Sequence, residues 1–182
     1  RGAAAARGAV LGLAAVTLVF GVMTVQRNAV WRDNLTLWAD ATVKSPDNGG
    51  AHPAYGFALM NAGRKADAEA HFARAVQLQP GLVDDMFGKG LVFAEKGLTK
   101  KAILTFNNVL VLDPRRAAAC IELGRLYEGR GWAAWAENQY EKALELDPSL
   151  AVAHERLGVL YRADGRDADA KRHLAEAVRL RP

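Results

Sequence analysis

The feature that most constrains the fold of this chain is a repeat with a period of 34 residues. Four separate series of residues keep this spacing and stay in register with one another. They are Pro46, Pro80, Pro114, Pro148 and Pro182; Gly56, Gly90, Gly124 and Gly158; Gly63, Gly97, Gly131 and Gly165; and Ala68, Ala102, Ala136 and Ala170. A fixed period of this length is the signature of an array in which each unit packs on the next.

Each period predicts two helices. In the first helix a small residue such as Gly56 allows another helix to cross closely. Gly63 ends that helix, because glycine adopts a left-handed backbone without strain. The second helix carries Ala68 at a close contact and a bulky residue four positions later, and the proline then ends it. The bulky residues are Phe72, Phe106, Tyr140 and Leu174.

This pattern resembles the tetratricopeptide repeat (TPR). Residues 117–150 match it at Leu123, Gly124, Tyr127, Ala136, Tyr140, Ala143 and Pro148, and residues 151–182 at Leu157, Gly158, Tyr161, Ala170, Ala177 and Pro182. The resemblance implies an all-α, right-handed superhelical solenoid of antiparallel helix pairs. Its four units would be 49–82, 83–116, 117–150 and 151–182. The second unit departs from the pattern at Lys89 and Val109, and the large aromatic usual near the start of each unit is replaced by His52, Met86, Cys120 and His154.

The N-terminal part predicts a membrane-spanning helix. Residues 8–25 form an uncharged, mostly apolar run, and we assign residues 1–26 to a transmembrane helix with its flanks. A secretory signal peptide and a buried helix of a soluble domain are the alternatives. Residues 27–48 would connect this segment to the repeats, and 33–44 would form a capping helix with Trp38 and Ala41 in the bulky and small positions.

Composition and charge exclude several functions. The net charge is +4, too small and too dispersed for a nucleic-acid partner. Cys120 is the only cysteine, so no internal disulfide forms, and we expect it to be a buried thiol. The four histidines occupy equivalent repeat positions, which predicts that they are spread along the solenoid and do not converge on a metal. We therefore expect no catalytic residue, cofactor or metal site, and no enzyme activity in this chain.

The TPR resemblance implies a protein or peptide partner in a concave groove lined by the first helix of each unit. The side chains expected to line this groove are Phe57, Met60, Phe87, Leu91, Arg125, Glu128, Glu155 and Arg162. Exposed apolar patches and aromatic or arginine side chains are typical of binding surfaces. The alternative for Phe57 and Leu91 is that they pack between helices. The sequence specifies neither the identity of the partner nor the oligomeric state.

The junction from residue 24 to 40 resembles that of transmembrane-and-TPR proteins related to O-mannosyltransferases. The resemblance implies that the repeats lie outside the cytoplasm, in a periplasm or lumen. Two functions follow. The chain is a membrane-anchored interaction scaffold, which we favour, or the docking arm of a multi-span glycosyltransferase. A soluble adaptor whose apolar N-terminal helix packs on another protein is the third alternative.

Overall fold

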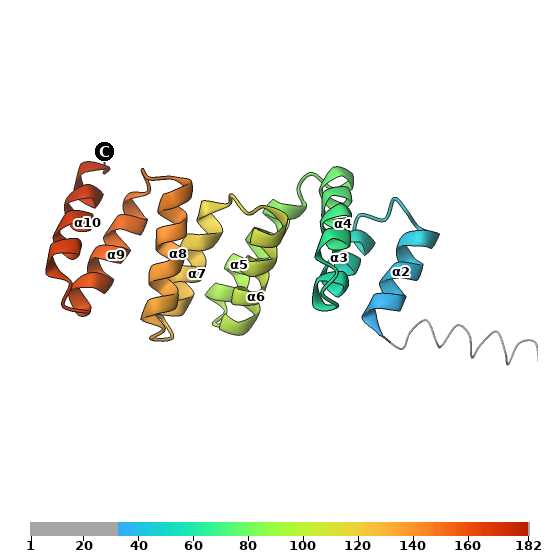
Figure 1. Ribbon diagram of the computed structural model, residues 1–182, viewed down its shortest axis with the longest axis horizontal. Coiled ribbons are helices and arrows are strands. Elements are labelled where there is room, and N and C mark those ends of the chain that lie inside the picture. The colour runs from blue at the N-terminus through green and yellow to red at the C-terminus, as the bar shows by residue number, and fades with distance from the viewer. Residues whose placement is uncertain (1–32, 182) are drawn as a thin grey trace, which may run out of the picture. The chain divides into compact units, whose positions relative to one another are not determined.

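The computed structural model describes residues 33–181, and there the chain is entirely helical (Figure 1). The helices are α2(Asn34–Lys44), α3(Ala51–Asn61), α4(Lys65–Leu78), α5(Leu82–Glu95), α6(Thr99–Leu112), α7(Ala117–Glu128), α8(Ala133–Leu146), α9(Ala151–Ala163) and α10(Asp167–Arg179). None of these helices is both long and apolar enough to cross a bilayer. The predicted spanning segment 8–25 lies outside the described residues.

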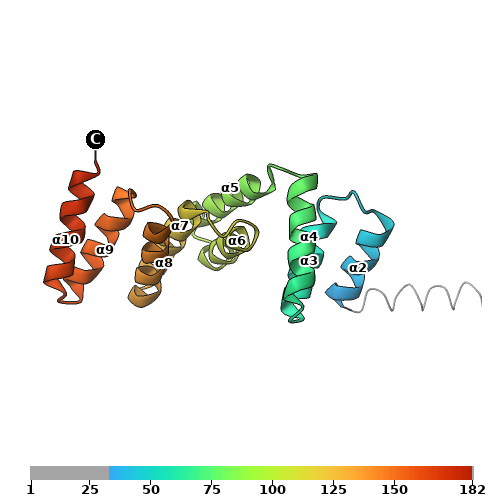
Figure 2. The same ribbon diagram turned by 45° about the horizontal axis from the view of Figure 1, so that its top comes forward.

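The described helices fall into two compact units, divided between Gln79 and Pro80. In the first unit, α2 packs on α3, and α3 packs on α4. In the second unit, each helix from α5 to α10 lies beside the next one along the chain (Figures 1 and 2). The helices pair in the order α3–α4, α5–α6, α7–α8 and α9–α10, with α5 beginning at Leu82, one residue before the start expected for its repeat.

Glycine ends the first helix of every pair, as predicted. The φ angles of Gly63, Gly97, Gly131 and Gly165 lie between 69 and 76°, in the left-handed region. The next residue then donates its backbone N–H to the carbonyl five positions earlier, for example from Trp132 to Tyr127 at 2.9 Å. This bond satisfies a carbonyl that the helix end leaves open.

Within each pair, the second helix places a bulky side chain directly on a glycine of the first. A Cβ built on Gly124 would lie 2.5 Å from the ring of Tyr140, and one on Gly90 would lie 2.6 Å from the ring of Phe106. The same contact joins Gly56 to Phe72 and Gly158 to Leu174. The predicted close crossing is thus confirmed, and its partner is the bulky residue of the same repeat. The alanines Ala68, Ala102, Ala136 and Ala170 are buried beside these contacts.

The helix α2 spans residues where a capping helix was expected. Its N-terminal N–H groups are capped by Asp33, whose Oδ1 accepts a 2.7 Å hydrogen bond from the backbone N–H of Thr36. Thr42 is buried and Trp38 is half-buried, so α2 presents this side to the rest of the first unit. The first unit therefore gains a third helix on its N-terminal side.

Two glycines of α5 provide a matched test of the close crossing. Gly90→Ala places a methyl group into the ring of Phe106, and we expect it to lower the free energy of unfolding by about 1–3 kcal/mol. Gly88→Ala meets no atom within 4 Å, and we expect it to raise that free energy by about 0.5–1 kcal/mol, because alanine favours helix more than glycine does. Urea denaturation measures the free energy of unfolding of both variants. If Gly88→Ala lowered it as much as Gly90→Ala does, the close contact with Phe106 would not be the cause.

Candidate functional site

A pocket of about 390 Å³ lies between α5 and α7 in the second unit. It is lined by Leu91, Ala94, Glu95, Glu122, Arg125 and Leu126. These residues lie at spacings of three and four on their helices, so each helix presents them on one face. The pocket therefore combines three apolar and three charged side chains, and a mixture of apolar surface and a few polar groups is typical of binding sites.

The one cation among the residues that line this pocket, Arg125, forms a long ion pair. Arg125 is exposed, and its Nη1 lies 3.3 Å from Oε1 of Glu122 three positions earlier on the same helix. The Arg125 side chain is 55% exposed, whereas that of Glu122 is 20% exposed. The Arg125 guanidinium therefore has a face open to solvent, where it can bind a carboxylate of a partner.

The other charged groove residues are engaged differently. Glu128 accepts a hydrogen bond from the hydroxyl of buried Tyr140, and burial together with Glu128 raises the pKa of that tyrosine well above its usual range. Glu155 accepts a 2.7 Å bond from Arg181, whereas Arg162 is exposed at the end of α9. The structure thus brings Leu91 and Arg125 together in the pocket. Glu128, Glu155 and Arg162 are not among its lining residues.

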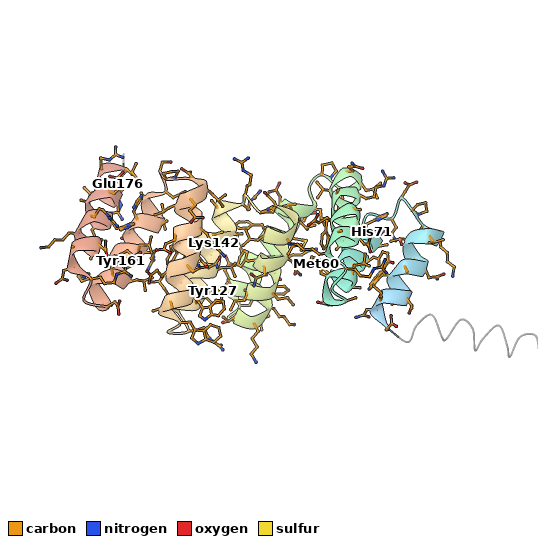
Figure 3. All side chains as sticks on the ribbon, viewed as in Figure 1. Met60, His71, Tyr127, Lys142, Tyr161 and Glu176 are labelled. Atoms are coloured by element: carbon orange, nitrogen blue, oxygen red, sulfur yellow. The ribbon has the colours of Figure 1, made fainter. Side chains whose placement is uncertain are left out.

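The aromatic groove candidates contact rings of their own helix pairs. The ring of Phe57 lies 4.9 Å from that of Phe72, and the ring of Phe87 lies 5.4 Å from that of Phe106. Phe87 is also covered by the guanidinium of Arg116 at 5.1 Å. Met60 lies half-buried on α3 (Figure 3), and it belongs to the first unit, as Phe57 does.

Comparison with known proteins agrees with this geometry. Residues 117–150 match the sequence family described as "Tetratricopeptide repeat". The fold is that of a TPR solenoid. The MamA crystal structure superimposes with a TM-score of 0.53 at 21% identity, covering 79% of this chain and 84% of that one. The second TPR domain of Spaghetti (RPAP3), bound to the HSP90 peptide SRMEEVD, superimposes with a TM-score of 0.52 at 21% identity, covering 54% of this chain and 92% of that one.

Among curated proteins, cellulose synthase operon protein C of Komagataeibacter xylinus is 36% identical over 72 residues. The match covers 40% of this chain and 6% of that protein, so the chain spans a small fraction of its relative. The similarity lies in a stretch about two repeats long.

The histidines of the TPR units meet in pairs, contrary to the expectation that they are spread apart. Nδ1 of His52 lies 3.0 Å from Nδ1 of His71, and the pair His154 and His173 has the same separation. In each pair the two residues are 19 positions apart, one on each helix of a repeat. This shared spacing was visible in the sequence, but only the packing of the two helices shows that it produces contact.

In a neutral pair, the hydrogen bonds determine which nitrogen of each ring carries the proton. Nε2 of His52 lies 2.9 Å from the backbone carbonyl oxygen of Pro46, which can only accept, so Nε2 carries the proton. The bare Nδ1 of His52 then accepts from the Nδ1–H of His71. His154 repeats the arrangement with the carbonyl of Pro148 at 3.2 Å. A pair in which both rings are protonated would set two N–H donors and two positive charges against each other.

Among the residues that the structure describes, no group of three or more His, Cys, Asp or Glu side chains could hold a metal ion. Cys120 is buried, as expected, and burial raises the pKa of its thiol, which keeps it protonated.

We predict that acid destabilises the TPR units through these pairs. Burial and the neighbouring His52 lower the pKa of His71, and Asp67 opposes this shift. Burial also lowers the pKa of His173, with His154 and Arg172 acting in the same direction. Asp169 and Glu141 oppose that second shift. The folded chain therefore binds fewer protons than the unfolded chain. The contribution of these histidines to the free energy of unfolding is fully present above the pKa of histidine in the unfolded chain, about 6.5. It is lost as the pH falls below that value toward the lower pKa of the folded state.

The test compares the chain with the double variant His71→Gln/His173→Gln. Gln139 occupies the equivalent position in the third repeat and is buried there, so the substitution suits the fold. Urea denaturation at neutral pH and at a pH below the histidine range should show a smaller loss of stability in the variant. The same loss in both proteins would mean that other groups cause the acid sensitivity.

Proposed function

We propose that this chain is a TPR scaffold that binds a segment of another protein in the pocket between α5 and α7. The observation that carries the proposal is the joint presence of apolar Leu91, Ala94 and Leu126 with the exposed Arg125 at one pocket. A segment with an apolar side chain followed by a carboxylate fits this arrangement. The apolar side chain would enter the pocket, and the carboxylate would bind the exposed face of Arg125.

The similarity to TPR structures supports a peptide as the class of ligand. The domain of Spaghetti (RPAP3) that shares the fold holds a peptide rich in acidic residues. At 21% identity this likeness concerns the fold, so the acidic preference proposed here rests on Arg125 and not on that domain.

Membrane attachment is a further part of the proposal. It is supported by the uncharged run 8–25, which as a helix would be about 27 Å long and would match the bilayer core. We propose that this segment anchors the repeats on the extracytoplasmic side of a membrane. The alternative is that they form the docking arm of an O-mannosyltransferase-like membrane glycosyltransferase, which the junction at residues 24–40 supports. In that case a protein acceptor would occupy the same pocket.

Selection from a phage-displayed peptide library tests the pocket. Peptides that bind the full chain should share an apolar residue close to a carboxylate. Arg125→Glu should weaken their binding roughly 30-fold or more, because it places a like charge where the carboxylate binds. The helical circular dichroism should not change, since Arg125 is exposed.

Arg172→Glu is the matched control, because Arg172 is exposed on α10 and is not among the residues that line the pocket. It should leave the affinity for the peptides unchanged. Peptides that bind Arg125→Glu as tightly as they bind the unmodified chain would exclude the proposed site.

A further inference from the structure

At the turn between the two helices of each repeat, two positions differ in residue type from one repeat to the next. These are the residue before the second helix and the residue three positions later. In the first and fourth repeats they form an ion pair, Arg64 with Asp67 at 2.7 Å and Arg166 with Asp169 at 3.4 Å. In the third repeat both are tryptophans, Trp132 and Trp135. The fold of the turn therefore does not require an aromatic residue at either position.

The two tryptophans are unusually exposed. Trp132 retains 45% and Trp135 63% of its accessible surface, and Leu98, which takes the place of Trp132 in the second repeat, retains 42%. Both indole rings lie about 6 Å from the ring of Tyr127 (5.9 and 6.0 Å), so they form one cluster. Neither indole N–H donates a hydrogen bond within the described part of the chain. Large apolar side chains left in solvent in this way indicate a contact surface.

Basic side chains lie beside this cluster. The guanidinium of Arg130 lies 5.1 Å from the ring of Trp132, and Arg130 also lines a shallow pocket of about 300 Å³ with Leu98, Lys100 and Lys101. The equivalent stretches 94–101 and 128–135 together contain four cations and two carboxylates, Glu95 and Glu128. By contrast, residues 162–169 of the fourth repeat contain two arginines and three aspartates. The two turns with exposed Leu98 and the tryptophans therefore carry a net positive charge, whereas the turn of the fourth repeat carries a net negative charge.

We propose that this aromatic-basic edge (Leu98, Lys100, Lys101, Arg130, Trp132 and Trp135) docks on a lipid bilayer that contains anionic lipid. Tryptophan favours the level of the lipid headgroups, where the ring is buried and its N–H stays hydrated. Lysine and arginine beside it attract anionic headgroups. The edge combines the α5–α6 and α7–α8 turns, which lie along the lower side of Figure 1, with the first residues of α6 and α8. Exposed side chains at the ends of helices suit a broad charged surface better than a peptide, which binds in a groove.

This docking does not depend on the pocket between α5 and α7 or on the segment 8–25. It would set a second point of attachment to the membrane and fix which edge of the second unit faces the lipid. A chain anchored only at its N-terminus would leave that edge in solvent. The two kinds of attachment can therefore be separated by observing the tryptophans themselves.

The experiment uses the full chain with Trp31→Phe and Trp38→Phe, so that Trp132 and Trp135 are the only indoles. The protein is added to vesicles of phosphatidylcholine, with or without phosphatidylglycerol, that carry a spin-labelled lipid. We expect quenching of indole fluorescence in the anionic vesicles and little in the neutral ones. Lys100→Gln/Lys101→Gln should lower the equilibrium constant for docking roughly tenfold or more, and added salt should have the same effect.

The control is Lys171→Gln/Arg172→Gln, which removes two exposed cations from α10 and should leave quenching unchanged. Co-flotation of the chain with the vesicles without quenching would show anchoring by another segment and would overturn the docking of this edge. Equal quenching in neutral vesicles would overturn the role of charge. A shift of indole emission with polyglutamate, in the absence of any quenching by lipid, would assign the edge to an acidic protein instead.

Discussion

The structure depends on one contact, in which a bulky side chain of the second helix rests on the bare backbone of a glycine in the first. Tyr140 on Gly124 and Phe106 on Gly90 are examples, and any Cβ at the glycine would lie within 3 Å of the ring. Glycine has no side chain, and the bulky residue of the second helix fills the space that a side chain would take. The two helices can therefore approach closely, and only one register fits. Within each pair, the same close approach buries the alanines, and in the first and fourth repeats it brings two histidines within 3.0 Å of each other.

Much of the architecture follows from residues whose effect on the backbone is local. Glycine adopts a positive φ and proline lacks an N–H, so the helix ends are readable without knowledge of the neighbours. The orientation of half-buried side chains could not be read in this way, and for Phe57 both a groove position and packing between helices were open. The structure places the rings of Phe57 and Phe87 beside those of Phe72 and Phe106 and leaves both side chains half-buried, so their contact with a ligand stays a prediction. The direction of a side chain on a half-buried face depends on the shape of the adjacent helix, which a single sequence does not contain.

The repeats share a constant interior and differ at their surfaces. The positions of the glycine stops and the bulky residues barely change, whereas the turn positions change from an arginine–aspartate pair to two tryptophans. The two positions that hold the histidine pairs vary although they are partly or fully buried. In the third repeat they hold Cys120 and Gln139, both of which are buried. Substitutions that leave the helix spacing intact can therefore give each repeat its own chemistry. For this reason the pocket at Arg125 and the exposed tryptophans stand out against the other repeats.

In the second unit each helix packs mainly on the helix before it and the helix after it in the chain. A globular domain held by contacts between distant parts of the sequence breaks in one event when its ends are pulled. Here tension applied at the C-terminus would detach α10 and α9 first and leave α5 to α8 in place, because the repeats are coupled only to their neighbours. Under such a load the unit would lengthen in steps, and it would shorten again as each helix pair re-forms.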